Sequence, residues 1–381
     1  MPKNLSNSAA NIAALKARAK KRIPAFAFDY LAGGCNDNLT LAKNRHSLDS
    51  VALEPRYLDG DGLAGTETSL LGHAWRYPFG IAPLGLGGII WPGAAEAHAR
   101  AAKELNIPYV LSTLATTSLE KAVQLADGNC WFQLYPPKDI SIRNDLIKRA
   151  QDAGCRHLVV TVDVPVAGRR PKDIQNGLAI PPRIDLHSLW QSALRPRWSV
   201  ETLIHGLPRF ESIMPYVDKT ASLAEVADYI RIQLKAVVDE KLLREIRRDW
   251  PHHLIVKGIS TVRDAQIAVD AGADALIVSN HGGRQLDAAI PAIDQLSGIV
   301  DSIGDNAVVM ADSGVESGVD IARFLARGAQ MVFCGRAFMY GVGAFGAPGA
   351  LHSGEILAAE LEQVLAQLRC ASPAQLKERL S

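Results

Sequence analysis

The chain has 381 residues, of which 48% are hydrophobic, and it carries a formal net charge of +1 at pH 7. This balance gives no electrostatic basis for binding nucleic acid, which calls for a strongly basic surface. The five cysteines are scattered without a closely spaced pair. Their spacing argues against a zinc site or a disulfide framework and fits a reducing compartment, so we expect no metal.

The amino-terminal residues 1–22 are polar and rich in alanine and lysine, without the apolar core of a signal peptide. No run of about 18 apolar residues is present that would span a membrane. We therefore expect a cytoplasmic protein, at most attached to a membrane surface. Residues 8–34 are predicted to form one amphipathic helix that stops at Gly33-Gly34. Tyr30 lies just before this stop, either as a packing aromatic or as a functional side chain.

From residue 79 onward, short apolar runs rich in β-branched residues alternate with alanine-rich helical segments. The predicted strands cover residues 79–83, 109–112, 130–135, 157–163, 253–258, 275–280, 307–312 and 331–335. The predicted helices cover roughly 93–105, 118–126, 141–153, 239–249, 261–271, 291–302, 316–327 and 354–368. Eight strands, each followed by a helix, predict an α/β fold of the (β/α)8 TIM-barrel type.

The barrel is expected to cover about 79–368, with the N-terminal helix as an extension. Continuous apolar strands without alternation indicate a parallel sheet buried on both faces. A doubly wound open sheet is the competing architecture, but no GxGxxG motif follows the first strand. Because α/β barrels routinely use this length as one domain, we expect residues 1–381 to form a single domain.

In a barrel, the carboxyl end of every strand faces one mouth, where barrel enzymes hold their catalytic groups. Polar or ionisable residues follow almost every predicted strand. The strand ends read Pro83-Leu84-Gly85, Ser112-Thr113-Leu114, Gln133-Leu134-Tyr135, Thr161-Val162-Asp163, Lys257-Gly258, Ser279-Asn280-His281, Asp312-Ser313-Gly314 and Cys334-Gly335-Arg336. This pattern predicts an active site at the mouth.

The segment 279–287, SNHGGRQLD, combines a potential base with a potential anion-binding group. His281 could act as general base, and a carboxylate such as Asp163 could steady its imidazolium form. Arg284 follows it closely, and Arg170 follows the fourth strand. Two arginines at one mouth suggest a substrate with a carboxylate, although each alone is more often a surface charge. Proton transfer beside anion binding is what oxidation of a hydroxy acid requires.

Three further strand ends leave their function open. Lys257 could form a Schiff base, hold a fixed positive charge for a developing anion, or pair with an acid such as Asp163. Gly314 and Gly335-Arg336 follow the last two strands, between which barrels often bind a phosphate. Glycine-rich loops after strands are common, so an ordinary loop is the alternative there.

About 90 residues separate the fourth and fifth strands, far more than a βα connection needs. Residues 177–225 are predicted to form a long insertion in which apolar anchors and two tryptophans alternate with arginines. These residues are Pro181, Pro182, Trp190, Leu194, Trp198, Ile204, Leu207, Phe210, Ile213, Met214, Arg183, Arg195, Arg197 and Arg209. The composition suits a segment lying on a lipid headgroup layer. An active-site lid or a subunit contact is the alternative.

The segment 279–287, together with the strand ends, resembles the signature of the FMN-dependent L-2-hydroxy acid oxidases and dehydrogenases. That family includes glycolate and lactate oxidases, quinone-linked L-lactate dehydrogenase and (S)-mandelate dehydrogenase. The resemblance runs from about Ile23 to the end of the chain. It implies FMN as cofactor, oxidation of an L-2-hydroxy acid to the 2-oxo acid with two electrons passed to the flavin, and a homo-oligomer, a tetramer.

The resemblance also implies how the substrate is held. Tyr30 and Tyr135 match the two active-site tyrosines that hydrogen-bond the substrate. Arg170 and Arg284 match the arginines that bind its carboxylate. Leu114 matches the position that shapes the side-chain pocket, where glycolate oxidases carry tryptophan and mandelate dehydrogenase a small residue. An apolar side chain of intermediate size is compatible with substrates of lactate size or larger.

The catalytic and flavin-binding roles follow from the same resemblance. His281 matches the base, and Asp163 matches the acid paired with it. Lys257 matches the lysine beside flavin N1 and the C2 carbonyl, which replaces the Schiff-base interpretation. The residues implied to bind FMN are Ala82, Pro83, Leu84, Gly85, Ser112, Gln133, Thr161, Lys257, Ser279, His281, Arg284, Asp312, Ser313, Gly314, Gly335 and Arg336.

Two departures from the family pattern bear on function. Glu316 stands where the family carries an arginine on the FMN phosphate. We expect Glu316 to turn to solvent, Arg336 to bind the phosphate alone, and FMN retention to be weakened. The second position is Gly85. Oxidases of the family tend to carry alanine there, whereas the dehydrogenases carry glycine.

The insertion adds to this argument, since Leu194-Arg195-Pro196-Arg197-Trp198 and His205-Gly206 resemble the membrane segment of mandelate dehydrogenase. Together with Gly85 it favours a dehydrogenase that passes electrons to a quinone, peripheral on the cytoplasmic face of the inner membrane. A soluble oxidase that forms hydrogen peroxide is the close alternative. A flavin-binding barrel without turnover, motivated by Glu316, is a more remote one.

Overall fold

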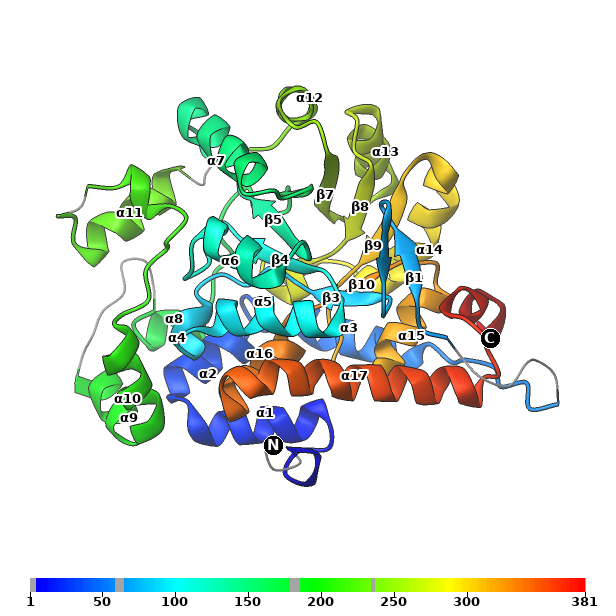
Figure 1. Ribbon diagram of the computed structural model, residues 1–381, viewed down its shortest axis with the longest axis horizontal. Coiled ribbons are helices and arrows are strands. Elements are labelled where there is room, and N and C mark those ends of the chain that lie inside the picture. Colours follow the sequence, from blue (N-terminus) through cyan, green and yellow to red (C-terminus); the bar gives the residue numbers. More distant parts are fainter. Residues whose placement is uncertain (1–4, 59–64, 179–185, 219, 234–236, 381) are drawn as a thin grey trace.

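The computed structural model describes residues 5–58, 65–178, 186–218, 220–233 and 237–380. A closed barrel of parallel strands lies at its centre, with the strands in chain order and the last paired to the first (Figure 1). The strands are β3 (Phe79–Ile81), β4 (Tyr109–Ser112), β5 (Cys130–Leu134), β6 (His157–Thr161), β7 (His253–Ile259), β8 (Ala275–Val278), β9 (Val308–Ala311) and β10 (Val332–Cys334). The predicted eight-stranded TIM barrel is confirmed.

Helices follow the strands and surround the barrel. They are α5 (Ala94–Leu105), α6 (Leu119–Ala126), α7 (Ile140–Asp152), α12 (Glu240–Asp249), α13 (Val262–Asp270), α14 (Ala292–Ile303), α15 (Gly318–Ala326) and α17 (Ala347–Gln367). Every residue of β4, β5, β6 and β8 is buried, because one face of these strands packs inside the barrel and the other against the helices. This two-sided burial explains why their sequences show no alternation.

A short antiparallel hairpin, which we did not predict, closes the amino-terminal end of the barrel. It consists of β1 (Thr68–Leu70) and β2 (His73–Trp75). Leu70 and Trp75 are buried among the side chains of the barrel interior. The ring of Trp75 lies 6.3 Å from that of Trp131, on which His157 stacks at 4.5 Å. Burial, followed by the charges of neighbouring histidines, lowers the pKa of His157 to about 3, so its ring is neutral near pH 7.

Residues 8–34 of the N-terminal extension form two helices, so the prediction of one helix there is wrong. Helix α1 (Ile12–Arg22) ends at Ile23, and α2 (Ala25–Ala32) begins after Pro24. A proline disfavours helical geometry at the residue before it and fits the first turn of a new helix. The predicted stop is confirmed, since α2 ends at Gly33.

The C-terminal region also differs from the prediction. Helix α16 (Arg336–Phe345) directly follows the last strand, and α17 begins several residues earlier than expected. Glycines in both helices allow them to pack closely. A Cβ atom on Gly341 would lie 2.1 Å from the carbonyl oxygen of Gly349. The remaining helical elements are α3 (Leu39–Ser50), α4 (Gly87–Ile90), η1 (Leu5–Asn7), η3 (His281–Gly283), η4 (Gly304–Asn306) and η5 (Pro373–Arg379).

The insertion after β6 forms a group of helices at the side of the barrel (Figure 1). They are α8 (Pro171–Gln175), α9 (Leu186–Ala193), α10 (Pro196–His205), η2 (Met214–Tyr216) and α11 (Leu223–Gln233). Pro181, Pro182 and Arg183 lie outside the described residues. Trp198 anchors α10, because it is buried, donates from Nε1 to the carbonyl of Ile90 at 3.1 Å, and packs edge-on against Phe26.

In contrast to Trp198, the other apolar residues of α9 and α10 form a face open to solvent. Leu186, Leu189 and Trp190 are spaced to share one side of α9 and are 85%, 55% and 64% exposed. The exposed residues of α10, and one just after it, follow the same helical spacing: they are Val200, Leu203, Ile204 and Leu207. We call these seven residues the exposed apolar face. Among the described residues, no helix is both long and apolar enough to cross a membrane.

Candidate active site

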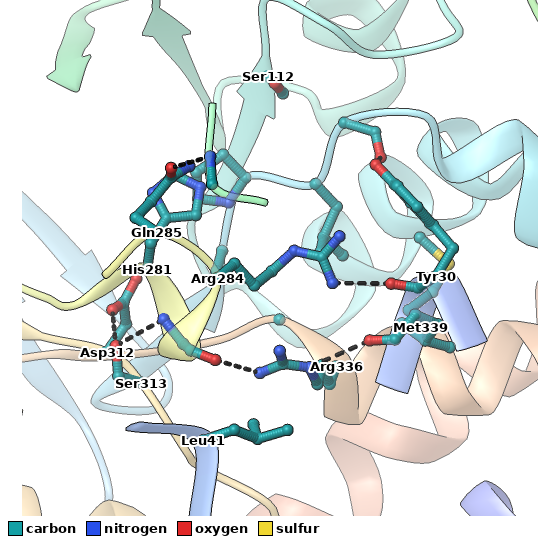
Figure 2. A pocket seen from close by; sticks show the side chains of 18 of the residues that line it. Tyr30, Leu41, Ser112, His281, Arg284, Gln285, Asp312, Ser313, Arg336 and Met339 are labelled. Atoms are coloured by element: carbon teal, nitrogen blue, oxygen red, sulfur yellow. Dashed lines mark hydrogen bonds between the residues drawn. The ribbon is translucent and has the colours of Figure 1, made fainter. Parts of the chain in front are cut away.

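A cavity of about 550 Å³ opens at the carboxyl ends of the barrel strands. Seven of the eight predicted strand ends contribute to its lining, and after β6 the lining residues begin at Val164, just beyond the predicted end 161–163. The predicted site residues that line it are Tyr30, Ala82, Pro83, Leu84, Gly85, Ser112, Leu114, Tyr135, Arg170, Lys257, His281, Arg284, Asp312, Ser313, Gly314, Gly335 and Arg336. The other predicted residues, Gln133, Thr161, Asp163 and Ser279, are not part of the lining and stand behind or beneath it. Figure 2 shows His281 and Tyr30 on opposite sides, with Arg284 between them.

His281 is held by a carboxylate in one orientation. Its Nδ1 lies 3.0 Å and 3.2 Å from the two carboxylate oxygens of Asp163, whereas its Nε2 faces the cavity. An ionised carboxylate accepts but cannot donate, so Nδ1 carries the proton and Nε2 has a free lone pair. Burial alone raises the pKa of Asp163, but His281 and Lys257 more than offset this effect, and the pKa lies below its ordinary value.

The backbone around His281 is unusual and is fixed by neighbouring residues. His281, Gly282 and Gly283 have φ values of +58°, +62° and +75°. A left-handed histidine is uncommon, and such strain is typical of functional sites. The amide of His281 donates to the hydroxyl of Ser279 at 3.0 Å, and that of Gly282 donates to the hydroxyl of Ser313, also at 3.0 Å.

The last residues of the segment 279–287 have structural contacts that sequence reasoning missed. The carboxylate of Asp287 accepts from the amides of Asp37 at 2.9 Å and Thr40 at 3.0 Å, at the start of α3. Gln285 accepts from the amide of Gly168 at 3.0 Å. These bonds tie the histidine loop to the N-terminal extension and to the loop after β6.

Two tyrosines border the cavity near His281. The hydroxyl of Tyr135 lies 3.4 Å from Nε2 of His281. Burial, followed by the charge of Asp163, raises the pKa of Tyr135, so its phenol stays protonated and can donate. The hydroxyl of Tyr30 donates to the carbonyl of Gly85 at 3.4 Å. Tyr30 therefore lies in the site rather than serving only as a packing aromatic.

Both predicted arginines lie over the ring of Tyr30. The guanidinium carbons of Arg284 and Arg170 are 4.9 Å and 5.3 Å from its centroid. Arg284 donates to the carbonyls of Tyr30 and Gly33 at 2.7 Å and 2.9 Å, and Arg170 pairs with Asp173 at 3.0 Å. Burial, then the nearby charge of Arg170, lowers the pKa of Arg284 to about 10. A bound carboxylate would relieve this repulsion.

Lys257 pairs with a different acid from the one predicted. Its ammonium lies 2.9 Å from the carboxylate of Asp312 and 2.8 Å from the hydroxyl of Ser279, whereas Asp163 pairs with His281. Burial by itself lowers the pKa of Lys257, but Asp312 and Asp163 outweigh it, and the pKa lies above its ordinary value. A charged ammonium is not a nucleophile, which gives a physical reason against a Schiff base.

Buried polar groups below the cavity fit a flavin. Both side-chain amide atoms of Gln133 and the hydroxyl of Thr161 have no hydrogen-bond partner among the described residues, although both residues are buried. Buried polar atoms are normally paired, and the edge of an isoalloxazine ring offers both donors and acceptors. Gly85 avoids a crowded contact, because a Cβ atom there would lie only 3.3 Å from Cβ of Leu114. The residues present therefore fit FMN.

The arrangement at Glu316 corrects the prediction that this side chain turns to solvent. Its carboxylate pairs with Lys16 of α1 at 3.1 Å and borders the cavity, with the side chain 30% exposed. Nothing in the sequence of the N-terminal helix distinguished Lys16 from its neighbours. Arg336 is also less available to bind a phosphate than expected, because its three nitrogens donate to backbone carbonyls. Their acceptors are Leu31 at 3.1 Å, Gly282 at 3.0 Å and Gly33 at 2.9 Å.

The insertion contributes to the cavity as well. Ile230 and Arg231 of α11 line its entrance, together with Val164 and Val166 of the loop after β6. Ile230 and Arg231 lie beyond the bounds of 177–225 predicted for the insertion, so they do not decide between its two interpretations. Helix α11 borders the mouth as a lid would, whereas α9 and α10 expose the apolar face elsewhere.

A barrel mouth that combines a histidine oriented by a carboxylate, two neighbouring arginines and a buried glutamine amide without a partner among the described residues suits an oxidoreductase that uses a flavin and an anionic substrate. The chain belongs to the FMN-dependent dehydrogenase family, whose model matches residues 19–381. It is an FMN-dependent oxidoreductase of the 2-hydroxy acid class.

Individual relatives agree with this membership. The chain is 35% identical to an L-lactate dehydrogenase of Caulobacter sp. (strain K31) over 91% of its own length and 92% of the relative. It is 36% identical to an (S)-mandelate dehydrogenase of Pseudomonas putida over 96% and 92%. The crystal structure of the monotopic membrane protein (S)-mandelate dehydrogenase superposes with a TM-score of 0.92 at 35% identity, covering 97% of this chain and 98% of that one.

Proposed function

We propose that this enzyme oxidises an L-2-hydroxy acid of lactate or mandelate type to the 2-oxo acid and passes the electrons to a quinone-type acceptor. The observation that carries the proposal is His281, whose Nδ1 is held by Asp163 and whose ring lines a cavity that also contains Arg170 and Arg284. A base beside two carboxylate-binding cations suits a hydroxy acid better than a neutral alcohol.

The protein groups would act as follows. Arg170 and Arg284 bind the substrate carboxylate and thereby fix the hydroxyl-bearing carbon. His281 takes a proton at Nε2, and Asp163 stabilises the imidazolium that results. Tyr135 and Tyr30 hydrogen-bond the substrate from the sides of the cavity. Binding of the carboxylate also lessens the repulsion between the arginines, which favours an anionic substrate.

Several strand-end residues would hold FMN, which supplies the two-electron chemistry when bound. Gln133, Thr161 and Ser112 offer hydrogen bonds to the edge of its ring, with the backbone of residues 82–85 beneath it. Lys257 provides a buried, permanently charged ammonium next to the ring, where reduction increases negative charge. Gly314, Gly335 and Arg336 lie at the phosphate end. Leu114 and Leu84 border the space for the substrate side chain, which is apolar and of moderate size.

Two observations support a quinone-type acceptor over oxygen. One is Gly85, where the family's oxidases tend to carry alanine and where a Cβ atom would lie only 3.3 Å from Cβ of Leu114. The similarity to the monotopic (S)-mandelate dehydrogenase extends over almost the whole chain, including the insertion. A dehydrogenase at a membrane surface has direct access to a quinone dissolved in the lipid. The alternative is a soluble oxidase that forms hydrogen peroxide.

We expect the purified enzyme, supplied with L-lactate or (S)-mandelate, to reduce a quinone analogue at least about tenfold faster than it reduces oxygen. The rates of quinone reduction and of peroxide formation are measured on the same preparation. The D-enantiomers serve as controls for the stereochemistry of the site. Peroxide formation at a rate equal to quinone reduction would establish the oxidase instead.

We further propose that the exposed apolar face binds a lipid surface. Its large side chains lie at helical spacing on α9 and α10, and Arg197 and Arg209 nearby are exposed. Apolar residues beside arginines suit the boundary between acyl chains and anionic headgroups. Trp198 fixes α10 to the barrel, so that the face would dock as part of a rigid body. The cytoplasmic side of the inner membrane and the tetramer remain predictions, the latter testable by light scattering.

Replacing Trp190, Leu203 and Ile204 together by serine is expected to lower partition onto vesicles with anionic lipid by about tenfold or more, because each buried apolar side chain contributes about 1.5–3 kcal/mol. Partition is measured by vesicle sedimentation. Turnover with a soluble dye should persist. Leu58→Ser is the matched control, since Leu58 is fully exposed but lies outside the insertion. Unchanged partition of the triple variant would exclude this face as the anchor.

A further inference from the structure

The phosphate end of the cavity lacks the arginine that the family carries at position 316, yet it contains other cations. Arg336, Arg45 and Lys16 all line this end, with Glu316 among them. A phosphate monoester brings between one and two negative charges. A carboxylate in the same place repels it unless a cation lies between the two.

Two of the three cations already contact backbone carbonyls or carboxylates of the protein. Arg336 donates to three backbone carbonyls. Arg45 donates to both carboxylate oxygens of Asp320, at 2.7 Å and 2.6 Å, and also pairs with Asp49 at 2.6 Å. Its charge is therefore balanced by two acids before any ligand binds.

Lys16 differs from both, because its ammonium contacts a single carboxylate. Its Nζ lies 3.1 Å and 3.4 Å from the two oxygens of Glu316, and 5.3 Å from the ring centroid of Tyr340. An ammonium has three donors and a flexible stem, so it can hold one acid and still bind a second anion. The side chain is 39% exposed, which leaves it free to adjust.

Tyr340 provides an independent indication of a ligand at this place. It is fully buried and lines the same cavity, and its hydroxyl has no hydrogen-bond partner among the residues that the structure describes. A buried hydroxyl without a partner is unusual in a folded protein. It lies on α16, whose amino terminus at Arg336 faces the same end of the cavity.

We propose that Lys16 binds the FMN phosphate in place of the missing arginine, with Glu316 holding its ammonium at that end of the cavity and the Tyr340 hydroxyl as a second donor. The assignment rests on the proposed flavin site. It gives the N-terminal extension a direct part in retaining the cofactor, because Lys16 lies on α1, which packs against α16 (Figure 1).

The test compares FMN with riboflavin, which lacks the phosphate, by flavin-fluorescence titration of the full-length chain. We expect Lys16→Met to raise the dissociation constant for FMN roughly tenfold, at the lower end for a charge-assisted bond at a partly exposed site. The constant for riboflavin should change by less than about twofold. Lys16→Arg should retain most of the FMN affinity. Lys21→Met, an exposed lysine on the same helix, is the matched control and should bind both flavins as the wild type does.

Combining Lys16→Met with Glu316→Gln distinguishes binding of the phosphate by Lys16 from mere neutralisation of the Glu316 carboxylate. If Lys16 binds the phosphate, Lys16→Met weakens FMN binding in the Glu316→Gln protein as well. If Lys16 only cancels the carboxylate, the same substitution has no effect there, and the proposal is wrong. Equal losses for FMN and riboflavin would point to a structural defect and also overturn it. A wild-type protein that binds neither flavin would overturn the proposed flavin site itself.

Discussion

Replacement of His281 by asparagine is expected to slow reduction of the bound flavin by an L-2-hydroxy acid by roughly 10²–10⁴-fold, the usual contribution of a general base. Asparagine suits this test because it tolerates the left-handed backbone at this position, where φ is +58°. It cannot take up a proton. The rate is measured by anaerobic stopped-flow absorbance, and flavin content should remain at the level of the wild type.

Asp163→Asn provides the companion variant. An amide at this position can donate to Nδ1 of His281, which would place the proton of the imidazole on Nε2, the nitrogen that faces the cavity. A loss of rate of similar order is therefore expected although the histidine is still present. A reduction rate within about threefold of the wild type for either variant would contradict the assigned base.

Replacement of Lys257 by methionine is expected to have the largest effect on stability. Lys257 is buried, and its loss leaves the carboxylate of Asp312 without the partner that lies 2.9 Å away. Breaking a buried ion pair in this way costs about 3–5 kcal/mol in the free energy of unfolding. Flavin reduction should also slow strongly, because the positive charge next to the ring is lost.

The double variant Lys257→Met/Asp312→Asn separates these two effects. Removing both charges should restore most of the free energy of unfolding, measured by urea denaturation, since no unpaired buried charge remains. It should not restore the rate of flavin reduction. Recovery of that rate in the double variant would show that Lys257 serves only to hold Asp312.

The barrel could be predicted because its signal repeats along the chain. The buried strands are apolar over most of their length, and almost every one is followed by a polar residue at the same end. Parallel strands bring all these ends to one mouth, so the residues of the site could be gathered without knowing any contact between them. Tyr30 lies outside the repeat, and only the resemblance indicated its place in the site.

The acid that pairs with Lys257 could not be predicted in the same way, whereas the resemblance did imply the pairing of Asp163 with His281. Asp163 and Asp312 both follow strands near Lys257, and the order of the chain does not say which one it contacts. The structure pairs Lys257 of β7 with the residue after β9, and Asp163 after β6 with His281 after β8. In a barrel, side chains of alternate strands share a layer, which accounts for both pairs.

Other features of the structure were not predicted, for equally specific reasons. Pro24 was a local signal for a helix break that the long amphipathic pattern obscured. Helix α16 and the start of α17 were not predicted, and their glycines take part in a close contact between the two helices that becomes visible only when the helices pack. Trp190 and Trp198 have the same composition around them, but only docking of α10 onto the barrel decides which of them is buried. Lys16 reaches Glu316 only through the docking of α1.

The central claim is that this chain holds FMN and reduces it with an L-2-hydroxy acid, and the absorbance of the purified protein tests it most directly. We expect a yellow protein whose flavin absorbance is bleached under anaerobic conditions by L-lactate or (S)-mandelate and is unchanged by the D-enantiomers. A colourless protein that takes up no flavin on reconstitution, or a yellow one that no hydroxy acid bleaches, would contradict the claim.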